Sequence, residues 1–266
     1  MKKNSIAIFD SGFGGLTAMR HIRALLPQEN IIYFGDTARL PYGNKSPETL
    51  FNYCVENVSF LLEQQIKVLV IACHTACTTA LERLKDKYPI PIIGIMEQGI
   101  EEVIHSTRTQ KIAIIGTRTT IASNVYQQRI KEKLPSAEIH AVACPLFVPL
   151  VEEGFCDHPI ASLIIKEYFS PLQNTDIDTL LLGCTHYPLL QSLIRKELGD
   201  AVILIDPAIG CAEKTRQLLV EHALLNTGQE SPQYTFYVSD DPDKFRVLGQ
   251  TFLNCPIDTI YLSARQ

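Results

Sequence analysis

One pattern constrains this chain more than any other, and it occurs twice: a buried strand that runs directly into a cysteine. Residues 68–72 form an apolar run that leads into Cys73, and residues 179–183 form a similar run that leads into Cys184. Continuous apolar runs of this length are typical of strands covered on both faces in a parallel sheet. The chain therefore places a thiol at the carboxyl end of a buried strand in each of its halves.

Each half also opens with a strand of the same kind. Residues 6–10 open the first half and residues 112–116 open the second, and the cysteine follows 63 residues later in the first half and 68 in the second. The alternative is that all parallel strand–helix units look alike. The matched spacing favours an internal duplication at the scale of a domain.

Short apolar runs alternate with amphipathic segments along both halves. Further strands are expected at residues 31–34, 91–95, 138–142 and 202–205, and helices after the cap Ser46-Pro47-Glu48 and near residues 121–133, 158–172 and 189–198. The final segment holds one helix near residues 211–225 and two short strands at 234–238 and 259–262. That is too little for a separate domain, so we expect it to pack onto the first lobe.

This alternation of strands and helices predicts an α/β fold with two pseudo-symmetric lobes, each a mostly parallel sheet flanked by helices. The first lobe comprises residues 1–96 plus 207–266 and carries Cys73, and the second comprises residues 97–206 and carries Cys184. Because ligands bind beyond the carboxyl ends of parallel strands, we expect the active site in the cleft between the lobes.

Composition narrows the classes of function. A net charge of -5 over 266 residues offers no basic field, so no nucleic acid partner is expected. No apolar run is long enough to span a bilayer, and Asp10 and the glycines after it interrupt any secretory signal, so we expect a cytoplasmic protein with no membrane partner. The eight cysteines form no CxxC pair, and most are expected to be buried and inert.

Cys73 and Cys184 differ from the other cysteines because each precedes a helical pattern and has titratable neighbours. His74 and His186 lie beside them in sequence, Thr75 and Thr185 follow at matching positions, and the loop after the first strand supplies Asp10. A helix N-terminus favours a thiolate. Two equivalent acid/base groups facing each other across one cleft suit inversion of a carbon centre, with one removing a proton and the other returning it to the opposite face.

The loop Asp10-Ser11-Gly12-Phe13-Gly14-Gly15 lacks the Lys-Ser/Thr of a phosphate-binding loop. An acid beside backbone amides suits a ligand that carries both an ammonium group and a carboxylate.

At these residues the chain resembles the glutamate racemases of bacterial cell-wall synthesis. The resemblance runs nearly end to end, and its motifs are Asp10-Ser11-Gly12-Phe13-Gly14-Gly15, Gly35-Asp36-Thr37-Ala38-Arg39, Pro41-Tyr42-Gly43, Ala72-Cys73, Gly116-Thr117 with Thr119-Thr120-Ile121, and Gly183-Cys184-Thr185-His186-Tyr187-Pro188. It implies interconversion of L- and D-glutamate without pyridoxal phosphate, metal or other cofactor, which supplies D-glutamate for peptidoglycan, and a homodimer is common in the family.

The resemblance also assigns roles by position. Cys73 and Cys184 are the paired acid/base thiols, assisted by Asp10 and His186 respectively. The substrate-binding set comprises Asp10, Ser11, Pro41, Tyr42, Gly43, His74, Thr75, Thr117, Thr120, Thr185 and His186.

His74 departs from the family pattern, which has asparagine after the first cysteine. A protonated imidazole would favour the Cys73 thiolate and grip a carboxylate, whereas a neutral ring swung aside would leave a substrate contact missing. Glutamate racemisation is therefore expected to be slow, biased in direction or aimed at a different acidic substrate, and His74→Asn should raise it.

Four other functions remain open on sequence grounds. They are a sister racemase for aspartate, another amino acid or a hydantoin, a thiol hydrolase that uses Cys184 and His186, a zinc site built from Cys73, His74, Cys184 and His186, and an amino-acid-binding protein with racemase activity weakened by His74.

Overall fold

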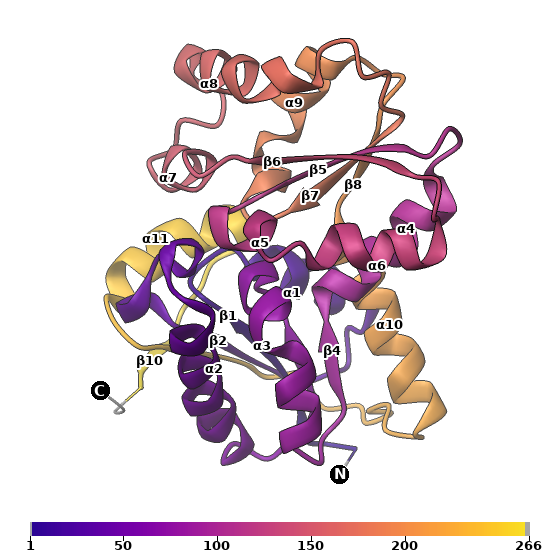
Figure 1. Ribbon diagram of the computed structural model, residues 1–266. Helices are drawn as coiled ribbons and strands as arrows, with labels where there is room; N and C mark the ends of the chain where they lie inside the picture. The colour runs from indigo at the N-terminus through magenta and orange to yellow at the C-terminus, as the bar shows by residue number, and fades with distance from the viewer. Residues whose placement is uncertain (1, 264–266) are drawn as a thin grey trace.

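The computed structural model describes residues 2–263, and it contains two lobes, each built on a parallel sheet (Figure 1). The strands are β1 (Ser5–Asp10), β2 (Ile31–Gly35), β3 (Ile66–Ile71), β4 (Ile92–Gly94), β5 (Lys111–Gly116), β6 (Glu138–Ala143), β7 (Thr179–Gly183), β8 (Ile203–Ile205), β9 (Tyr234–Val238) and β10 (Ile260–Leu262). Every pairing among them is parallel. The predicted fold class is confirmed, and each predicted strand lies within a few residues of its predicted place.

The two sheets repeat the same strand order. The first sheet runs β10-β9-β2-β1-β3-β4 and the second runs β6-β5-β7-β8, so that β2-β1-β3-β4 corresponds to β6-β5-β7-β8. The central strands β1, β3 and β7 are buried along almost their whole length, as their continuous apolar runs require. Cys73 follows β3 and Cys184 follows β7, which are equivalent strands of the two sheets.

The helices flank these sheets. They are α1 (Leu16–Leu25), α2 (Pro47–Leu62), α3 (His74–Lys87), α4 (Ile95–Ser106), α5 (Arg118–Ala122), α6 (Val125–Lys133), α7 (Phe147–Glu152), α8 (Pro159–Phe169), α9 (Gln191–Leu198), α10 (Pro207–Glu221) and α11 (Pro242–Leu253), with short 3-10 helices η1 (Thr37–Arg39), η2 (Tyr42–Asn44), η3 (Ser170–Leu172) and η4 (Tyr187–Leu190). No helix within residues 2–263 is long and apolar enough to cross a membrane.

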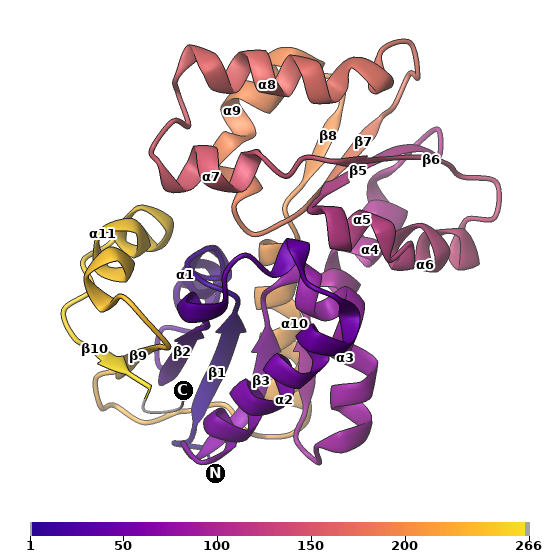
Figure 2. The same ribbon diagram turned by 60° about the vertical axis from the view of Figure 1, so that its left-hand side comes forward.

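The final segment packs onto the first lobe, as predicted. Strand β9 pairs with β2 and carries β10 at the sheet's edge, and α11 packs against α1 (Figure 2). Helix α11 was not predicted, although Asp241 caps it through the Lys244 amide and Pro242 starts it. Its buried Phe245 and Phe252 cover the first lobe.

Two helix predictions were wrong in detail. The helix expected over residues 121–133 is divided into α5 and α6 because Asn124 adopts a left-handed conformation with φ 58°. The helix expected immediately after Cys184 is the 3-10 turn η4, and α9 begins only at Gln191. Helix α4, which contains the predicted boundary at residue 96, contacts α10 and also β7. The lobe boundaries therefore stay a prediction.

Candidate active site

A small cavity of about 40 Å³ lies where β1, β3 and β7 end. Its lining contains every predicted site residue except Asp10 and Thr120, namely Ser11, Pro41, Tyr42, Gly43, Cys73, His74, Thr75, Thr117, Cys184, Thr185 and His186, and it adds Leu40 and Val148. Leu40 and Val148 also line a larger outer cavity of about 550 Å³. The two cysteines, predicted from opposite halves of the chain, thus share one enclosed space.

Cys73 is the N-cap residue of α3. Its Sγ accepts a hydrogen bond from the Ala76 amide and donates one to Ser11 Oγ, both at 3.5 Å. Burial raises the pKa of the Cys73 thiol to about 12, the negative charge of Asp10 acts in the same direction, and the contacts with Ser11 and the Ala76 amide lower it. The amide contact at the start of α3 lowers the pKa of the thiol, in the direction expected of a helix N-terminus, but burial has the larger effect.

Cys184 lies at the end of β7 with a different set of partners. Its Sγ is 3.9 Å from His186 Nδ1, and His186 Nε2 is 3.2 Å from Glu152 Oε1 on α7. Burial raises the pKa of the Cys184 thiol as well, and the charges of Asp10 and Glu152 act in the same direction. Glu152 was not predicted, because nothing in the sequence spacing links α7 to the strand end that carries His186.

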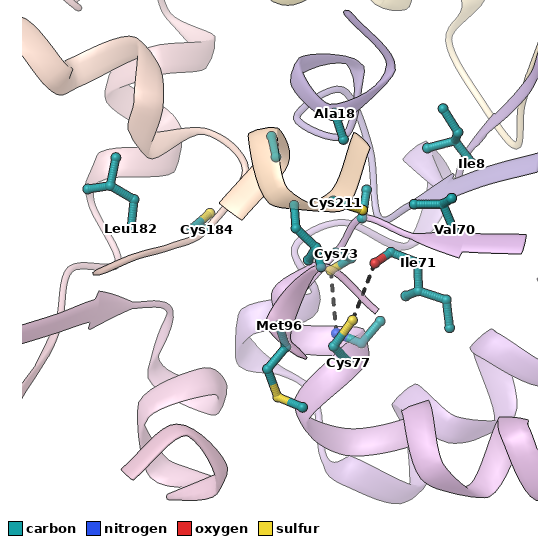
Figure 3. Close-up of a cluster of buried hydrophobic side chains, with 14 of the residues drawn as sticks. Ile8, Ala18, Val70, Ile71, Cys73, Cys77, Met96, Leu182, Cys184 and Cys211 are labelled. Carbon is teal, nitrogen blue, oxygen red and sulfur yellow. Dashed lines mark hydrogen bonds between the residues drawn. The ribbon is translucent and has the colours of Figure 1, made fainter. Parts of the chain in front are cut away.

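Figure 3 shows why both thiols are so strongly desolvated. Cys73 lies among buried apolar side chains that include Cys77, Met96 and Cys211, and Cys184 comes from the second lobe beside Leu182. Cys77 donates to the Ile71 carbonyl at 3.3 Å. A thiol in these surroundings ionises only if a nearby group accepts or shares its proton.

Asp10 ends β1 and is completely buried. Its Oδ2 accepts a hydrogen bond from the Gly12 amide at 2.9 Å, whereas Oδ1 has no hydrogen-bond partner within residues 2–263. Burial raises the pKa of Asp10, and His186 opposes that shift. Asp10 does not line the cavity, but its negative charge raises the pKa of both thiols.

The loop of residues 10–15, which follows β1, packs directly against Thr185 and His186, the two residues after Cys184. A Cβ on Gly14 would lie 2.1 Å from Thr185 Oγ1 and 2.6 Å from His186 Nδ1. Only glycine permits this approach, so the loop of the first lobe and the Thr185–His186 segment of the second form one surface.

Comparisons with known proteins agree with this geometry. The family model described as Asp/Glu/hydantoin racemase matches residues 17–214. The glutamate racemase of Neisseria meningitidis serogroup A is 46% identical over 97% of this chain and 96% of its own. The chain belongs to the Asp/Glu/hydantoin racemase family.

Solved structures of other family members extend the comparison. The glutamate racemase of Francisella tularensis, in complex with D-glutamate, superposes with a TM-score of 0.94 at 38% identity, and covers 99% of this chain and 98% of its own. The glutamate racemase isoform RacE1 of Bacillus anthracis gives a TM-score of 0.95 at 36% identity with the same coverage.

In this racemase-family chain, a buried carboxylate positions the loop of residues 41–43. The Tyr42 hydroxyl donates to Asp36, which also accepts from Asn57 Nδ2 and Arg39 Nε at 3.0 Å each. Because its hydroxyl is engaged in this way, Tyr42 can face a ligand only through its ring or backbone. Asp36 was part of a recognised motif, but no role was predicted for it.

The second lobe closes over the same loop. A Cβ on Gly43 would lie 2.7 Å from Thr117 Cβ, and Thr119 Oγ1 donates to the Gly43 carbonyl at 2.8 Å. The hydroxyls of Thr75, Thr117 and Thr120 lie 3.0–3.1 Å from one another. Thr120, which does not line the cavity, therefore supports the two threonines that do.

His74 is buried and hydrogen-bonded across the lobes. Its Nδ1 is 2.5 Å from the hydroxyl of Tyr126 on α6, and the two rings are stacked at an interplanar angle of 28°. Burial lowers the pKa of His74 to about 3, so the ring is neutral. Of the two states considered for His74, the neutral one agrees with this burial, and the Tyr126 hydroxyl holds the ring.

The residues considered for zinc do not form a metal site. Within residues 2–263 no three His, Cys, Asp or Glu side chains are grouped as metal ligands. All eight cysteines are free thiols.

Proposed function

We propose that this protein is a glutamate racemase that inverts the α-carbon of glutamate with Cys73 and Cys184 as its two bases. One observation carries the proposal: two thiols from equivalent strand ends of a duplicated fold line the same cavity. The substrate is inferred from the relatives of similar length that are named glutamate racemases, one of them solved with D-glutamate bound.

In this mechanism one cysteine is a thiolate and the other a thiol when substrate is bound. The thiolate sulfur takes the α-proton from one face, the electron pair passes to the α-carbon, and the thiol of the other cysteine delivers its proton to the opposite face. The first cysteine ends as the thiol and the second as the thiolate, so the reverse reaction exchanges their roles. No cofactor enters this balance of atoms and electrons.

The surrounding groups supply substrate binding and proton relay. Asp10 Oδ1, an acceptor without a partner among the described residues, suits the ammonium group. Hydroxyls from Ser11, Thr75, Thr117 and Thr185 suit the carboxylates, whose developing negative charge they stabilise. His186, held by Glu152, relays the proton of Cys184, and Asp10 serves Cys73.

The proposal extends to the protein's setting. A D-glutamate product fits the supply of peptidoglycan synthesis, a homodimer is the expected assembly, and the eight unpaired cysteines suit the reducing cytoplasm. Gel filtration and light scattering of the purified protein test the dimer.

The experiment is exchange of the α-proton of each glutamate enantiomer in deuterated water. We expect the wild type to exchange both enantiomers, and Cys73→Ser and Cys184→Ser each to impair abstraction most severely from a different enantiomer. Cys77→Ser and Cys144→Ser are matched controls, because each is a buried thiol of the corresponding lobe that donates to a backbone carbonyl.

The contrary outcomes separate the alternatives. Tight glutamate binding without exchange would favour an amino-acid-binding protein. Equal or faster turnover of aspartate would indicate the sister activity, and stoichiometric zinc in the purified protein would contradict the cofactor-free mechanism. Equal losses for both enantiomers in each variant would refute the assignment of one cysteine to each face.

A further inference from the structure

The contact between His74 and Tyr126 defines which nitrogen of the imidazole carries a proton. Both side chains are buried, and both are neutral because burial lowers the pKa of His74 to about 3 and raises that of Tyr126 well above its usual value. One hydrogen lies between the Tyr126 oxygen and His74 Nδ1, which are 2.5 Å apart. Either the phenol donates to Nδ1, or Nδ1–H donates to the phenol oxygen.

The other hydrogen bonds that the Tyr126 hydroxyl could make decide between these two directions of donation. Tyr126 is completely buried and makes no other hydrogen bond with the part of the chain that the structure describes. If Nδ1 were the donor, the phenol hydrogen would be left without an acceptor in an apolar interior, which is costly. If the phenol donates, the hydroxyl and Nδ1 satisfy each other, and the ring's single hydrogen lies on Nε2.

Nε2 is the polar atom of His74 that is left for a ligand. It has no hydrogen-bond partner within residues 2–263, and it is not among the fully occluded polar atoms that lack one. His74 lines the cavity together with Cys73 and Cys184. We infer that Tyr126 fixes His74 as the Nε2–H tautomer, so that residue 74 presents one hydrogen-bond donor to a carboxylate oxygen of the bound amino acid.

This inference rests on the proposed function for the identity of the ligand, but the tautomer itself does not depend on turnover. A neutral Nε2–H donor suits a carboxylate and cannot accept from an ammonium group, whereas an asparagine at this position could do both. Tyr126 belongs to α6 of the second lobe and His74 to α3 of the first, so closure of the lobes holds the donor in place. Tyr126 is thus a positioning residue, which acts through His74.

The tautomer can be read directly by long-range proton–nitrogen NMR of protein labelled with ¹⁵N-histidine. His74→Gln identifies the signals of His74 by their loss. We expect a protonated Nε2 and an unprotonated Nδ1 in the wild type, and a mixture of both tautomers in Tyr126→Phe. A protonated Nδ1 in the wild type would overturn the inference even if the protein racemises glutamate.

Kinetics tests the contact with the ligand. His74→Leu removes the donor and should raise KM for glutamate about 10- to 100-fold with a smaller change in kcat, as expected for loss of a hydrogen bond to a charged group. His74→Gln carries an amide that reaches toward the place of Nε2 and should recover most of the KM effect of His74→Leu. Tyr126→Phe should raise KM about twofold, because half of the rings would hold the competent tautomer.

Two results would overturn the contact. One is an unchanged KM in His74→Leu, and the other is an equal rise of KM in His74→Gln and His74→Leu. Circular dichroism of each variant shows that the fold is retained. A protein without racemase activity but with the expected nitrogen signals would instead contradict the proposed function and leave the tautomer standing.

Discussion

Gly14→Ala tests whether the close packing of the two lobes controls proton transfer at Cys184. The added methyl carbon would lie 2.1 Å from Thr185 Oγ1 and 2.6 Å from His186 Nδ1, whereas ordinary contacts begin at 3.4 Å. Thr185 and His186 must therefore move by about 1 Å. Because a displacement of about 1 Å at a reacting group costs about 100-fold in rate, we expect a loss of that order in turnover.

The loss should be directional. Exchange of the α-proton should fall most for the enantiomer whose exchange Cys184→Ser abolishes, because His186 serves that thiol. Gly14 has no left-handed φ, so alanine strains no backbone there. Gly210→Ala is the matched control, since its Cβ would meet no heavy atom nearer than 3.3 Å. Equal losses for both enantiomers, or less than a threefold loss with an intact circular dichroism spectrum, would refute the reasoning.

Three further predictions concern single groups. Glu152→Gln should lower racemisation roughly 10- to 100-fold in steady-state assays, because His186 loses the carboxylate that orients it. Lys67→Met should lower the free energy of unfolding by about 3–5 kcal/mol in urea titrations, because it leaves the buried Glu29 carboxylate without its cation. Stability should fall between pH 9 and 12 by about 1.4 kcal/mol per pH unit from Cys73 alone, because the unfolded thiol ionises first; urea midpoints in wild type and Cys73→Ser measure this contribution.

The strands were predictable because each has one strong cause. Continuous apolar runs such as residues 68–72 are typical of strands buried on both faces in a parallel sheet, whereas the order of the strands in each sheet was not predicted. The break between α5 and α6 was not predictable, because Asn124 is polar and compatible with either a helix or a turn until its φ is known. Helix α11 was missed although its cap and proline are plain and Phe245, Leu248 and Phe252 recur at helical spacing.

The residues that line the site could be predicted, but the side chains that hold those residues in place could not. Motif positions brought together the lining of the cavity, yet the carboxylates of Glu152 and Asp36 act through contacts between elements that are distant in sequence. The raised pKa of the Cys73 thiol could not be predicted, because a helix N-terminus can be read from the sequence and the depth of burial cannot. Tyr126 was missed for the same reason, since only the fold brings α6 against the start of α3.

The duplication explains the position of the two thiols but not their chemistry. Equivalent strands deliver Cys73 and Cys184 to one cavity, and burial raises the pKa of both, so neither ionises without help. The groups that could assist ionisation differ between the two cysteines. Cys73 contacts Ser11 and feels the charge of Asp10, whereas Cys184 contacts the ring of His186.

In the proposed mechanism, each of the two cysteines is nevertheless a thiolate at one stage of every turnover, in either direction. Two unlike relays therefore have to reach comparable proton affinities in the occupied site, although the symmetric backbone imposes no such match. In the proposed mechanism the substrate's own charges are the shared element, because its ammonium group would lie near Asp10, whose charge raises the pKa of both thiols. Neutralisation of that carboxylate by the ammonium group would lower the pKa of both thiols at once, and substrate binding would thereby activate both proposed bases.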